Sequence, residues 1–276
     1  MRWRFTKMHG AGNDFAILDC RASMLLPEAK TLQRMADRHF GIGFDQLLTI
    51  DPPQSPDAVA AYRIINQDGS FAQQCGNGAR CVAHWLVTEG VVDADGFVLD
   101  SPAGRIRVAR VGGLYALDMG LPVFAPEHVP LHMEAEAEGY HYRHEDMDLE
   151  FSALSMGNPH AVLLVDEVAV APVEAWGKAL QSAPIFPEGV NVGFAQRVDD
   201  GNIRLRVFER GVGETLACGS GACAAAVSLI RRGLLKRSVA VHLPGGTLMI
   251  DWPHDAAGVT MTGPAERVYQ GEWLDD

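Results

Sequence analysis

An internal repeat constrains the fold of this chain more than any other feature of its sequence. Asn13 and Asn158 are 145 residues apart, and Gln46 and Asn191 are separated by the same number. The same polar residue types therefore recur in the same order at one spacing. We predict that the chain contains two halves that fold alike.

A cysteine followed by glycines and a helical pattern occurs once in each half. Cys75 and Cys218 are 143 residues apart, as are Asn66 and Glu209. After each cysteine, apolar residues fall at the spacing of a core-facing helix. These residues are Ala79, Val82, Ala83, Leu86 and Val87 in the first half, and Ala222, Ala225, Ala226, Leu229 and Ile230 in the second. We predict that each cysteine begins a buried helix.

The remaining pattern is mostly that of short strands joined by Gly- and Pro-containing turns. We predict an α+β fold of two pseudo-symmetric domains, each a curved, mostly antiparallel sheet or barrel around a central helix. The expected domains are residues 1–118 with a returning C-terminal tail, 264–276, and residues 119–263. Pseudo-twofold packing would bring the helix N-termini to an interdomain cleft, where we expect the active site.

Composition excludes several classes of function. The 276-residue chain has a net charge of −12, which argues against nucleic acid or an anionic membrane as its main partner. No apolar run is long enough to cross a membrane, and the N-terminal segment lacks a signal-peptide core. Five cysteines in a chain of this length do not form a disulfide framework. We expect a cytoplasmic protein without a metal site, because no His and Cys stand at a zinc-binding spacing.

The two cysteines suggest proton-transfer chemistry. Unpaired N–H groups at a helix N-terminus stabilise a thiolate, and the same groups can hold a carboxylate. If Cys75 and Cys218 face each other, one thiolate can remove an α-proton while the other thiol returns a proton to the opposite face. A cysteine hydrolase would need only one of them. The other three cysteines, Cys20, Cys81 and Cys223, are expected to be buried small apolar residues.

The positions at which the halves differ point to the substrate. Where the first half has Asn66, the second has Glu209 followed by Arg210, whose guanidinium suits a second carboxylate. His160 is the best candidate among the histidines for assisting a cysteine. Five neutral amides on loops suit ammonium and carboxylate recognition: Asn13, Gln46, Asn66, Asn158 and Asn191. Residues 132–149 are charged, and we expect a solvated hairpin or loop there.

The sequence resembles the diaminopimelate epimerase family at several motifs spread over nearly the whole chain. They are Met8–Phe15 (MHGAGNDF), Asn66–Ser70 (NQDGS), Gln74–Cys81 (QCGNGARC), Gly157–His160 (GNPH) and Glu209–Ala222. Gly76-Asn77 follows the first cysteine, whereas proline-racemase-like relatives typically have Gly-His there. Ser220 stands where many relatives have Thr.

The resemblance implies cofactor-independent interconversion of LL- and meso-diaminopimelate, for lysine and peptidoglycan precursors. It implies Cys75 and Cys218 as the acid/base pair, supported by His160 and Glu209. It also implies that the backbone at two helix starts grips the reacting carboxylate, namely Gly76, Asn77, Gly219 and Ser220. The remaining implied substrate contacts are Asn13, Gln46, Asn66, Asn158, Asn191, Glu209 and Arg210. A homodimer is implied too, with Tyr269 as a candidate interface residue.

Two other functions remain open from the sequence. One is a racemase of another amino acid, such as proline or hydroxyproline, although Arg210 and the many amides favour a long substrate with two charged ends. The other is a non-enzymatic thiol redox or metal-binding protein that uses the same cysteines. Exchange of the substrate α-proton with deuterated water separates these possibilities.

Overall fold

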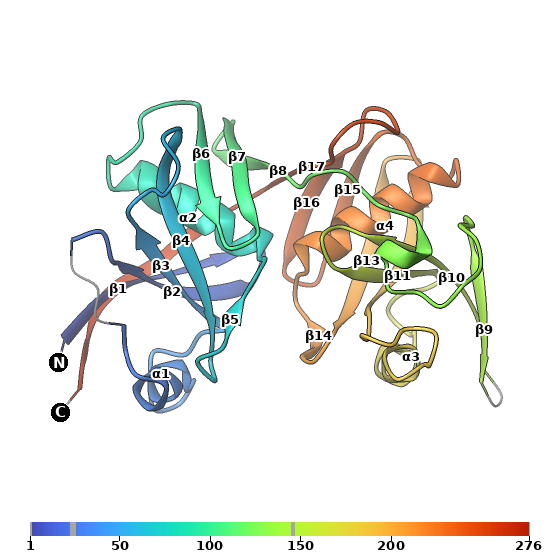
Figure 1. Ribbon diagram of the computed structural model, residues 1–276, viewed down its shortest axis with the longest axis horizontal. Helices are drawn as coiled ribbons and strands as arrows, with labels where there is room; N and C mark the ends of the chain where they lie inside the picture. Colours follow the sequence, from blue (N-terminus) through green and yellow to red (C-terminus); the bar gives the residue numbers. More distant parts are fainter. Residues whose placement is uncertain (1, 23–25, 145–146, 276) are drawn as a thin grey trace. The chain divides into compact units, whose positions relative to one another are not determined.

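The computed structural model describes residues 2–22, 26–144 and 147–275. It divides into two compact units, Met1–Asp118 with Thr262–Asp276 (unit 1) and Met119–Met261 (unit 2). In Figure 1, unit 1 contains the segments from blue to green together with the red C-terminal strand.

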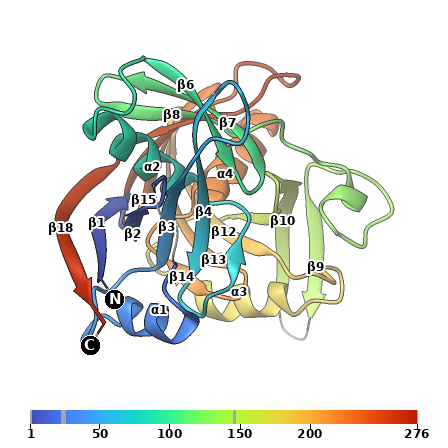
Figure 2. The same cartoon turned by 60° about the vertical axis from the view of Figure 1, so that its left-hand side comes forward.

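Unit 1 consists of a sheet, a central helix and an outer helix. Its helices are α1 (Ala29–Ala36) and α2 (Gly76–Thr88). Its strands are β1 (Arg2–Gly10), β2 (Asn13–Asp19), β3 (Gln46–Asp51), β4 (Ala58–Asn66), β5 (Phe71–Ala72), β6 (Gly96–Ser101), β7 (Gly104–Val111), β8 (Leu114–Asp118) and β18 (Glu266–Leu274). Strand β18 pairs antiparallel with β1, so the last described strand completes the sheet that the first one opens (Figure 2). From β1 the sheet continues through β2, β3, β4, β6 and β7 to β8, and only the β2–β3 and β4–β6 pairs are parallel.

Unit 2 repeats this arrangement. Its helices are the short 3₁₀ helix η1 (Pro126–His128), α3 (Val173–Gln181) and α4 (Gly219–Arg231). Its strands are β9 (Tyr140–His144), β10 (Met147–Ser155), β11 (Pro159–Leu164), β12 (Asn191–Asp199), β13 (Asn202–Glu209), β14 (Gly213–Thr215), β15 (Ser238–Leu243) and β16 (Gly246–Asp251). A further strand, β17 (Thr260–Gly263), lies at the boundary between the units. Again two pairs are parallel, β11–β12 and β13–β15.

The repeat extends to the pairing register of the strands. In unit 1, Phe15 lies opposite Gln46, and in unit 2, His160 lies opposite Asn191. Both residues of the second pair follow their counterparts by 145 positions. Later pairs also correspond: Ile65↔Phe71 with Phe208↔Glu214, and Leu99↔Ile106 with Val241↔Leu248. Because a slip of one residue would turn every side chain to the other face, this agreement confirms that the two halves share one fold.

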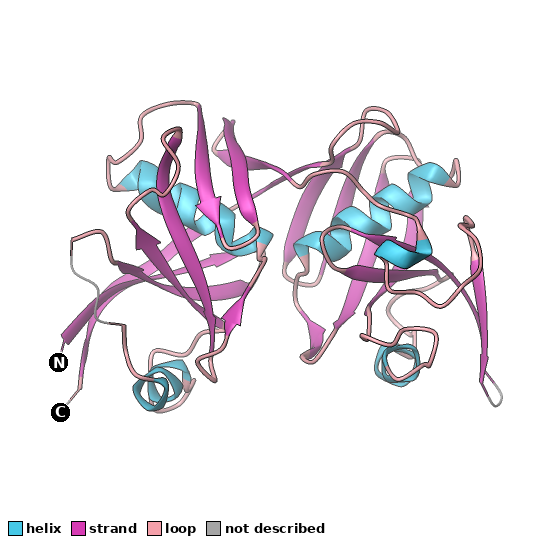
Figure 3. Cartoon of the chain, in the orientation of Figure 1, coloured by secondary structure: helices cyan, strands magenta, loops and turns pink. Residues whose placement is uncertain are grey.

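Both cysteine-headed helices lie among the strands of their own unit, as Figure 3 shows. The side chains of α2 are buried along most of its length, and those of α4 almost all round. A helix that is apolar all round has no face for solvent and must be enclosed. The alanines of α4 are small enough to let strands approach it from several sides. The predicted helices after Cys75 and Cys218 are thus confirmed.

The central strands are buried on both faces because a second helix covers the side away from the cysteine helix. In unit 1, Leu32 and Met35 of α1 belong to one core cluster with Ala16, Leu18 and Leu47. On the opposite face, Leu48 lies against α2, within 3.3 Å of the space where a Gly78 Cβ would be. Successive strand residues therefore pack into two separate cores. In unit 2, α3 packs in the same way on a cluster around Phe151, Phe186 and Phe194.

The described part of residues 132–149 includes strand β9 and the start of its antiparallel partner β10, in line with the expected hairpin, but part of it is buried. Tyr140 and Leu149 are 6% and 3% exposed and belong to the core cluster of unit 2. The solvated description is therefore wrong for these two side chains. Within the described part of the chain, no helix is both long and apolar enough to cross a membrane.

Candidate active site

Three strand ends of unit 1 bring polar side chains to one edge of its sheet. Strands β2 and β3 are parallel and begin at Asn13 and Gln46, while the antiparallel β4 ends at Asn66. Gln46 and Asn66 lie directly opposite each other, and the Gln46 Nε2 donates to the Asn66 Oδ1 at 2.9 Å. The Asn66 Nδ2 donates in turn to Ser70 Oγ at 3.0 Å. These amides are therefore held in defined orientations.

Cys75 is the N-cap residue of α2 and is partly exposed. Its extended backbone (φ −154°, ψ 99°) turns into the helix at Gly76. The N–H of Gly78 donates to Cys75 Sγ at 3.3 Å, so the thiol takes the place that a Ser or Asp oxygen usually holds at an N-cap. Such a donor stabilises a thiolate.

Asn13 lies beside this thiol. Cys75 Sγ is 3.6 Å from Asn13 Oδ1, and the Nδ2 of Asn77 donates to the same oxygen at 3.4 Å. The other end of the Asn13 amide donates to Asp45 Oδ2 at 2.8 Å. The tight turn before Asn13 requires positive φ at Ala11 and Gly12, which places Asn13 at the start of β2. Asn13, Cys75 and Asn77 thus meet at the N-terminus of α2.

Unit 2 presents the equivalent set of strand ends. Asn158 immediately precedes β11, Asn191 begins β12 and Glu209 ends β13. The Nδ2 of Asn191 donates to the Pro159 carbonyl at 3.0 Å, and its Oδ1 accepts from the backbone N–H of Arg210 at 3.0 Å. Asn191 therefore joins the strands on both sides of it at the edge where the cysteine helix begins.

Cys218 is the N-cap residue of α4 and is 5% exposed. Its Sγ lies 3.7 Å from Ser220 Oγ. Burial, followed by the negative charge of Glu209, raises the pKa of Cys218 well above that of an ordinary thiol. Cys218 therefore holds a proton at neutral pH in this state of the protein.

Glu209 is fixed in place by a threonine that sequence reasoning missed. Thr215 Oγ1 donates to Glu209 Oε1 at 2.5 Å, across the β13–β14 hairpin. The unit 1 residue at the same place in the repeat is Ala72, which has no hydroxyl. The change from Ala72 to Thr215 accompanies the change from Asn66 to Glu209, and it is the signal that could have identified Thr215.

His160 is a buried neutral imidazole. It is 1% exposed, and its Nε2 is hydrogen-bonded to Asn158 Oδ1 at 2.9 Å. Burial, followed by the positive charge of Arg210, lowers the pKa of His160 to about 3. At neutral pH the ring therefore carries no charge, and it orients Asn158 next to the N-terminal edge of β11.

Arg210 is exposed and extends along the backbone of a neighbouring loop. Its Nη1 donates to the Glu188 carbonyl at 2.8 Å. Gly189 has a φ of +69°, and a Cβ there would lie 3.2 Å from Arg210 Cδ. The glycine thus lets the arginine stem lie flat on the loop, and the guanidinium keeps donors for an anion.

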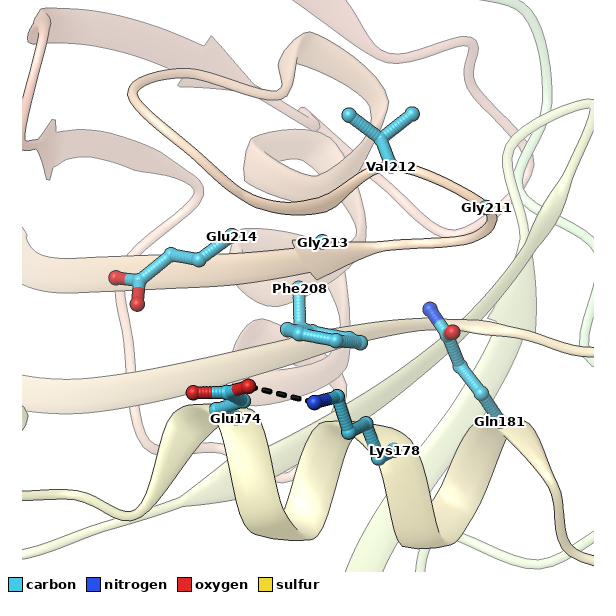
Figure 4. A pocket seen from close by; sticks show the side chains of 8 residues that line it. All are labelled: Glu174, Lys178, Gln181, Phe208, Gly211, Val212, Gly213 and Glu214. Atoms are coloured by element: carbon cyan, nitrogen blue, oxygen red, sulfur yellow. Dashed lines mark hydrogen bonds and ion pairs between the residues drawn. The ribbon is translucent and has the colours of Figure 1, made fainter.

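A cavity of about 490 Å³ lies in unit 2 behind the β13–β14 turn (Figure 4). Glu174, Lys178 and Gln181 of α3 line one wall, and Phe208 faces them. Lys178 donates to Glu174 at 2.6 Å. Neither cysteine lines this space. It adjoins the turn that follows Arg210, and none of the predicted catalytic residues lines it.

The structure places the remaining predicted residues as follows. Gly76 and Asn77 form the first turn of α2, and Gly219 and Ser220 form that of α4. The first N–H groups of a helix have no acceptor within it, so both turns can receive an anion. Tyr269 lies on β18, 44% exposed, with its ring edge-on to Phe5. In the described ranges, no three His, Cys, Asp or Glu side chains gather as metal ligands would.

Comparison with known proteins gives one consistent result. The sequence model of the diaminopimelate epimerase family matches residues 5–125 and 152–268. A diaminopimelate epimerase of Xanthomonas campestris pv. campestris is 57% identical over 274 residues, which are 99% of this chain and 96% of that protein. One of Xylella fastidiosa is 56% identical over 272 residues, covering 98% and 95%.

Solved structures show the same fold at low sequence identity. A hydroxyproline epimerase from Agrobacterium vitis has a TM-score of 0.71 at 16% identity, covering all of this chain and 93% of the other. A phenazine biosynthesis protein of the PhzF family from Bacillus anthracis has the same TM-score and identity, covering all of both chains. The two repeated α+β halves are thus shared with these proteins. Because the family model matches most of the chain and the curated relatives match nearly all of it, the chain belongs to the diaminopimelate epimerase family.

Proposed function

We propose that this protein interconverts LL- and meso-diaminopimelate without a cofactor, by α-proton transfer between Cys75 and Cys218. The observation that carries the proposal is that both cysteines are N-cap residues of buried helices at equivalent edges of repeated sheets. The relatives from Xanthomonas and Xylella are named diaminopimelate epimerases, which supports the substrate and the isomerase activity.

In the proposed reaction, one cysteine thiolate takes the α-proton and becomes a thiol. The electron pair left on the carbon is delocalised into the adjacent carboxylate, and N–H groups of the helix starts stabilise the added charge. The other thiol then gives its proton to the opposite face of the carbon and becomes a thiolate. The reverse reaction exchanges the two roles, so the configuration at that carbon inverts with no net change in protons.

The structure supports distinct roles for the supporting residues. The raised pKa of Cys218 suits a proton donor, and Glu209 contributes to it through its charge. The neutral His160 is hydrogen-bonded to Asn158 rather than carrying a charge that would fix one direction of transfer. We propose that Asn13, Gln46, Asn66, Asn158 and Asn191 bind the substrate's polar groups. Arg210 provides the charge for the carboxylate at the far end.

The test is α-proton exchange in deuterated water, followed by mass spectrometry or NMR. With LL-diaminopimelate, the wild-type protein should incorporate deuterium at one α-carbon and form the meso isomer. Cys75→Ala and Cys218→Ala should each reduce epimerisation by about 10² to 10⁴, because that is the contribution of proton transfer by a positioned side chain. Exchange with hydroxyproline but not with diaminopimelate would instead assign a proline-type racemase. No exchange with either substrate would favour a redox or metal-binding protein.

We further propose that the enzyme acts in the cytoplasm, in lysine and peptidoglycan precursor biosynthesis. All five cysteines are free thiols, which a reducing compartment preserves. We also propose a homodimer that uses the exposed face of β18 around Tyr269. Sedimentation of the wild type and of Tyr269→Ala tests it: the wild type should have the mass of two chains, and the variant should dissociate at higher concentration.

A further inference from the structure

The amide of Asn13 is held at both ends by groups whose hydrogen-bond roles cannot reverse. Asp45 Oδ2 accepts from Asn13 Nδ2 at 2.8 Å. A carboxylate at neutral pH only accepts hydrogen bonds, so the nitrogen of the amide must face Asp45. The Asn13 oxygen then points the other way, towards Asn77 and Cys75.

Arg80 fixes the orientation of Asn77, which contacts the oxygen end of the Asn13 amide. Its side chain is completely buried on α2, where its Nη2 donates to Asn77 Oδ1 at 2.8 Å and its Nε donates to the Pro264 carbonyl at 3.1 Å. A guanidinium is always charged and only donates. The oxygen of Asn77 must therefore face Arg80, and its nitrogen must face Asn13. Each of the two amides therefore accepts a hydrogen bond on the side of Arg80 and donates one on the side of Asp45.

The anchor at Asp45 is itself rigidly supported. Arg38 Nη2 donates to Asp45 Oδ1 at 2.6 Å and to Asp14 Oδ1 at 2.8 Å. Lys7 is also bonded to Asp14. Burial alone would raise the pKa of Asp14, but the hydrogen bonds from Arg38 and Lys7 lower it to about 2. The ionised Asp14 therefore holds Arg38 in place, and Arg38 in turn holds Asp45.

This orientation of the Asn13 amide determines that the Cys75 sulfur faces the amide oxygen and not the nitrogen. Asn13 Oδ1, an acceptor, is 3.6 Å from the sulfur, while the Gly78 N–H donates to the same sulfur at 3.3 Å. A protonated Cys75 can donate its S–H to the Asn13 oxygen. A thiolate would instead be repelled by the lone pairs of that oxygen. The amide thus favours the thiol of Cys75, and the helix N-terminus favours the thiolate.

We propose that Asp45 and Arg80 are positioning residues for Cys75, holding the Asn13 amide so that its oxygen restrains the thiol proton. The proposal rests on the acid/base role proposed above for Cys75. It gives Asn13 a second task besides binding substrate. When a substrate ammonium group engages the Asn13 oxygen, the restraint on Cys75 weakens and Gly78 can stabilise the thiolate. Formation of the base is thereby coupled to the arrival of substrate.

The test measures how fast iodoacetamide alkylates Cys75, by peptide mass spectrometry at a fixed pH near neutrality. The rate reports the thiolate fraction and needs no enzymatic turnover, so it remains informative if the proposed activity is wrong. Asp45→Ala and Arg80→Met are each made in the wild type and in Asn13→Ala. Each variant also removes a charge, and the Asn13→Ala background measures that contribution by itself.

If the residues act through Asn13, the effect of each substitution on the rate should differ between the two backgrounds. Each substitution should speed up alkylation of Cys75 more in the wild type than in Asn13→Ala. The fold-change in the wild type divided by the fold-change in Asn13→Ala should be about three to ten, which corresponds to one net hydrogen bond. A ratio near one, or a ratio in the opposite direction, for both residues overturns the proposal. A ratio near one for a single residue overturns the role of that residue.

Two further variants keep the test decisive. Arg80→Lys retains the charge and the stem but cannot make both directed bonds of the guanidinium, and it replaces Arg80→Met if that variant does not fold. It should show the same direction of change. Asp57→Ala removes a surface carboxylate of unit 1 that pairs with Arg105, and it should leave the Cys75 rate unchanged. A rate change as large as that of Asp45→Ala would mean that general charge, not amide direction, governs the thiol.

Discussion

Helix α3 approaches strand β13, which ends at Glu209, so closely that only glycine fits at one position of the helix. A Cβ added to Gly177 would lie 2.5 Å from Phe208 Cγ and 2.8 Å from Phe208 Cβ. Phe208 is 6% exposed and belongs to the core cluster of unit 2. Rotating its side chain does not relieve the clash, because Cβ is directly attached to the backbone of the strand and stays in place. Gly177→Ala must therefore displace the helix or the strand.

The expected size of the effect follows from two opposing contributions. Overpacking a core by one methyl group costs about 1–3 kcal/mol. Alanine has a better helix propensity than glycine by about 1 kcal/mol, which offsets part of the loss. Three heavy atoms of Phe208 closer than 3.0 Å place the cost in the upper part of that range, at about 2–3 kcal/mol. After the offset, Gly177→Ala should lower the free energy of unfolding by roughly 1–2 kcal/mol. Because Phe208 adjoins Glu209, the displaced strand should also lower kcat/KM.

Urea denaturation followed by circular dichroism measures the loss, and Gly193→Ala is the matched control. Gly193 is in β12 of the same unit, but a Cβ there would meet its nearest neighbour at 3.4 Å, an ordinary contact. The double variant Gly177→Ala/Phe208→Ala provides a second check, since alanine lacks Cγ and Cδ1, the two atoms nearest to the added Cβ. The reasoning is refuted if Gly177→Ala is as stable as Gly193→Ala, or if Phe208→Ala destabilises both backgrounds equally.

The remaining predictions concern the titrating groups and the loop under Arg210. The pKa of His160 is lowered from 6.5 to about 3, so the unfolded chain binds this proton more tightly than the folded protein does. The free energy of unfolding is therefore highest above about pH 6.5 and decreases as the pH falls towards 3. Thermal unfolding of His160→Gln should show a smaller loss of stability between these pH values, and an unchanged slope would contradict the assignment. Glu209→Gln removes a charge that raises the pKa of Cys218, so it should accelerate alkylation of Cys218 measured by peptide mass spectrometry; slower alkylation would show that Glu209 does not act through its charge. Gly189→Ala places a Cβ at a φ of +69° and 3.2 Å from Arg210 Cδ, and it should raise KM several-fold with a smaller change in kcat, measured by steady-state kinetics. An equal fall in kcat with KM unchanged would argue against a binding role for Arg210.

The fold could be predicted from the sequence because the same structural signals occur twice, once in each half. The offset between Gln46 and Asn191 reappears as the matched register of Phe15↔Gln46 and His160↔Asn191. Burial of the two cysteine helices followed from apolar periodicity alone. Strands β15 to β17 were not individually predicted, because their short alternating segments give weaker signals than a helix does.

The hydrogen bonds that support the site residues could not be predicted from the sequence. Asp45 has no counterpart in the repeat, since the second half has Val190 in that place, and nothing in the sequence links it to Asn13. Arg80 meets Pro264 across 184 positions, a contact that only the returning tail creates. The neutrality of His160 depends on the depth of its burial, which its sequence neighbours do not reveal. Side-chain hydrogen bonds depend on tertiary placement, and periodicity carries no information about them.

The pairing of β18 with β1 has a consequence for synthesis on the ribosome. Arg2 lies opposite Leu274, so a strand made early in translation waits for a partner that is made only after unit 2. Unit 2 is continuous in sequence and can complete its sheet before β18 has emerged from the ribosome. The half that is translated second is then the first to finish folding. Until β18 has emerged, the nascent chain exposes an unpaired β1 edge, where chaperones and premature association would act.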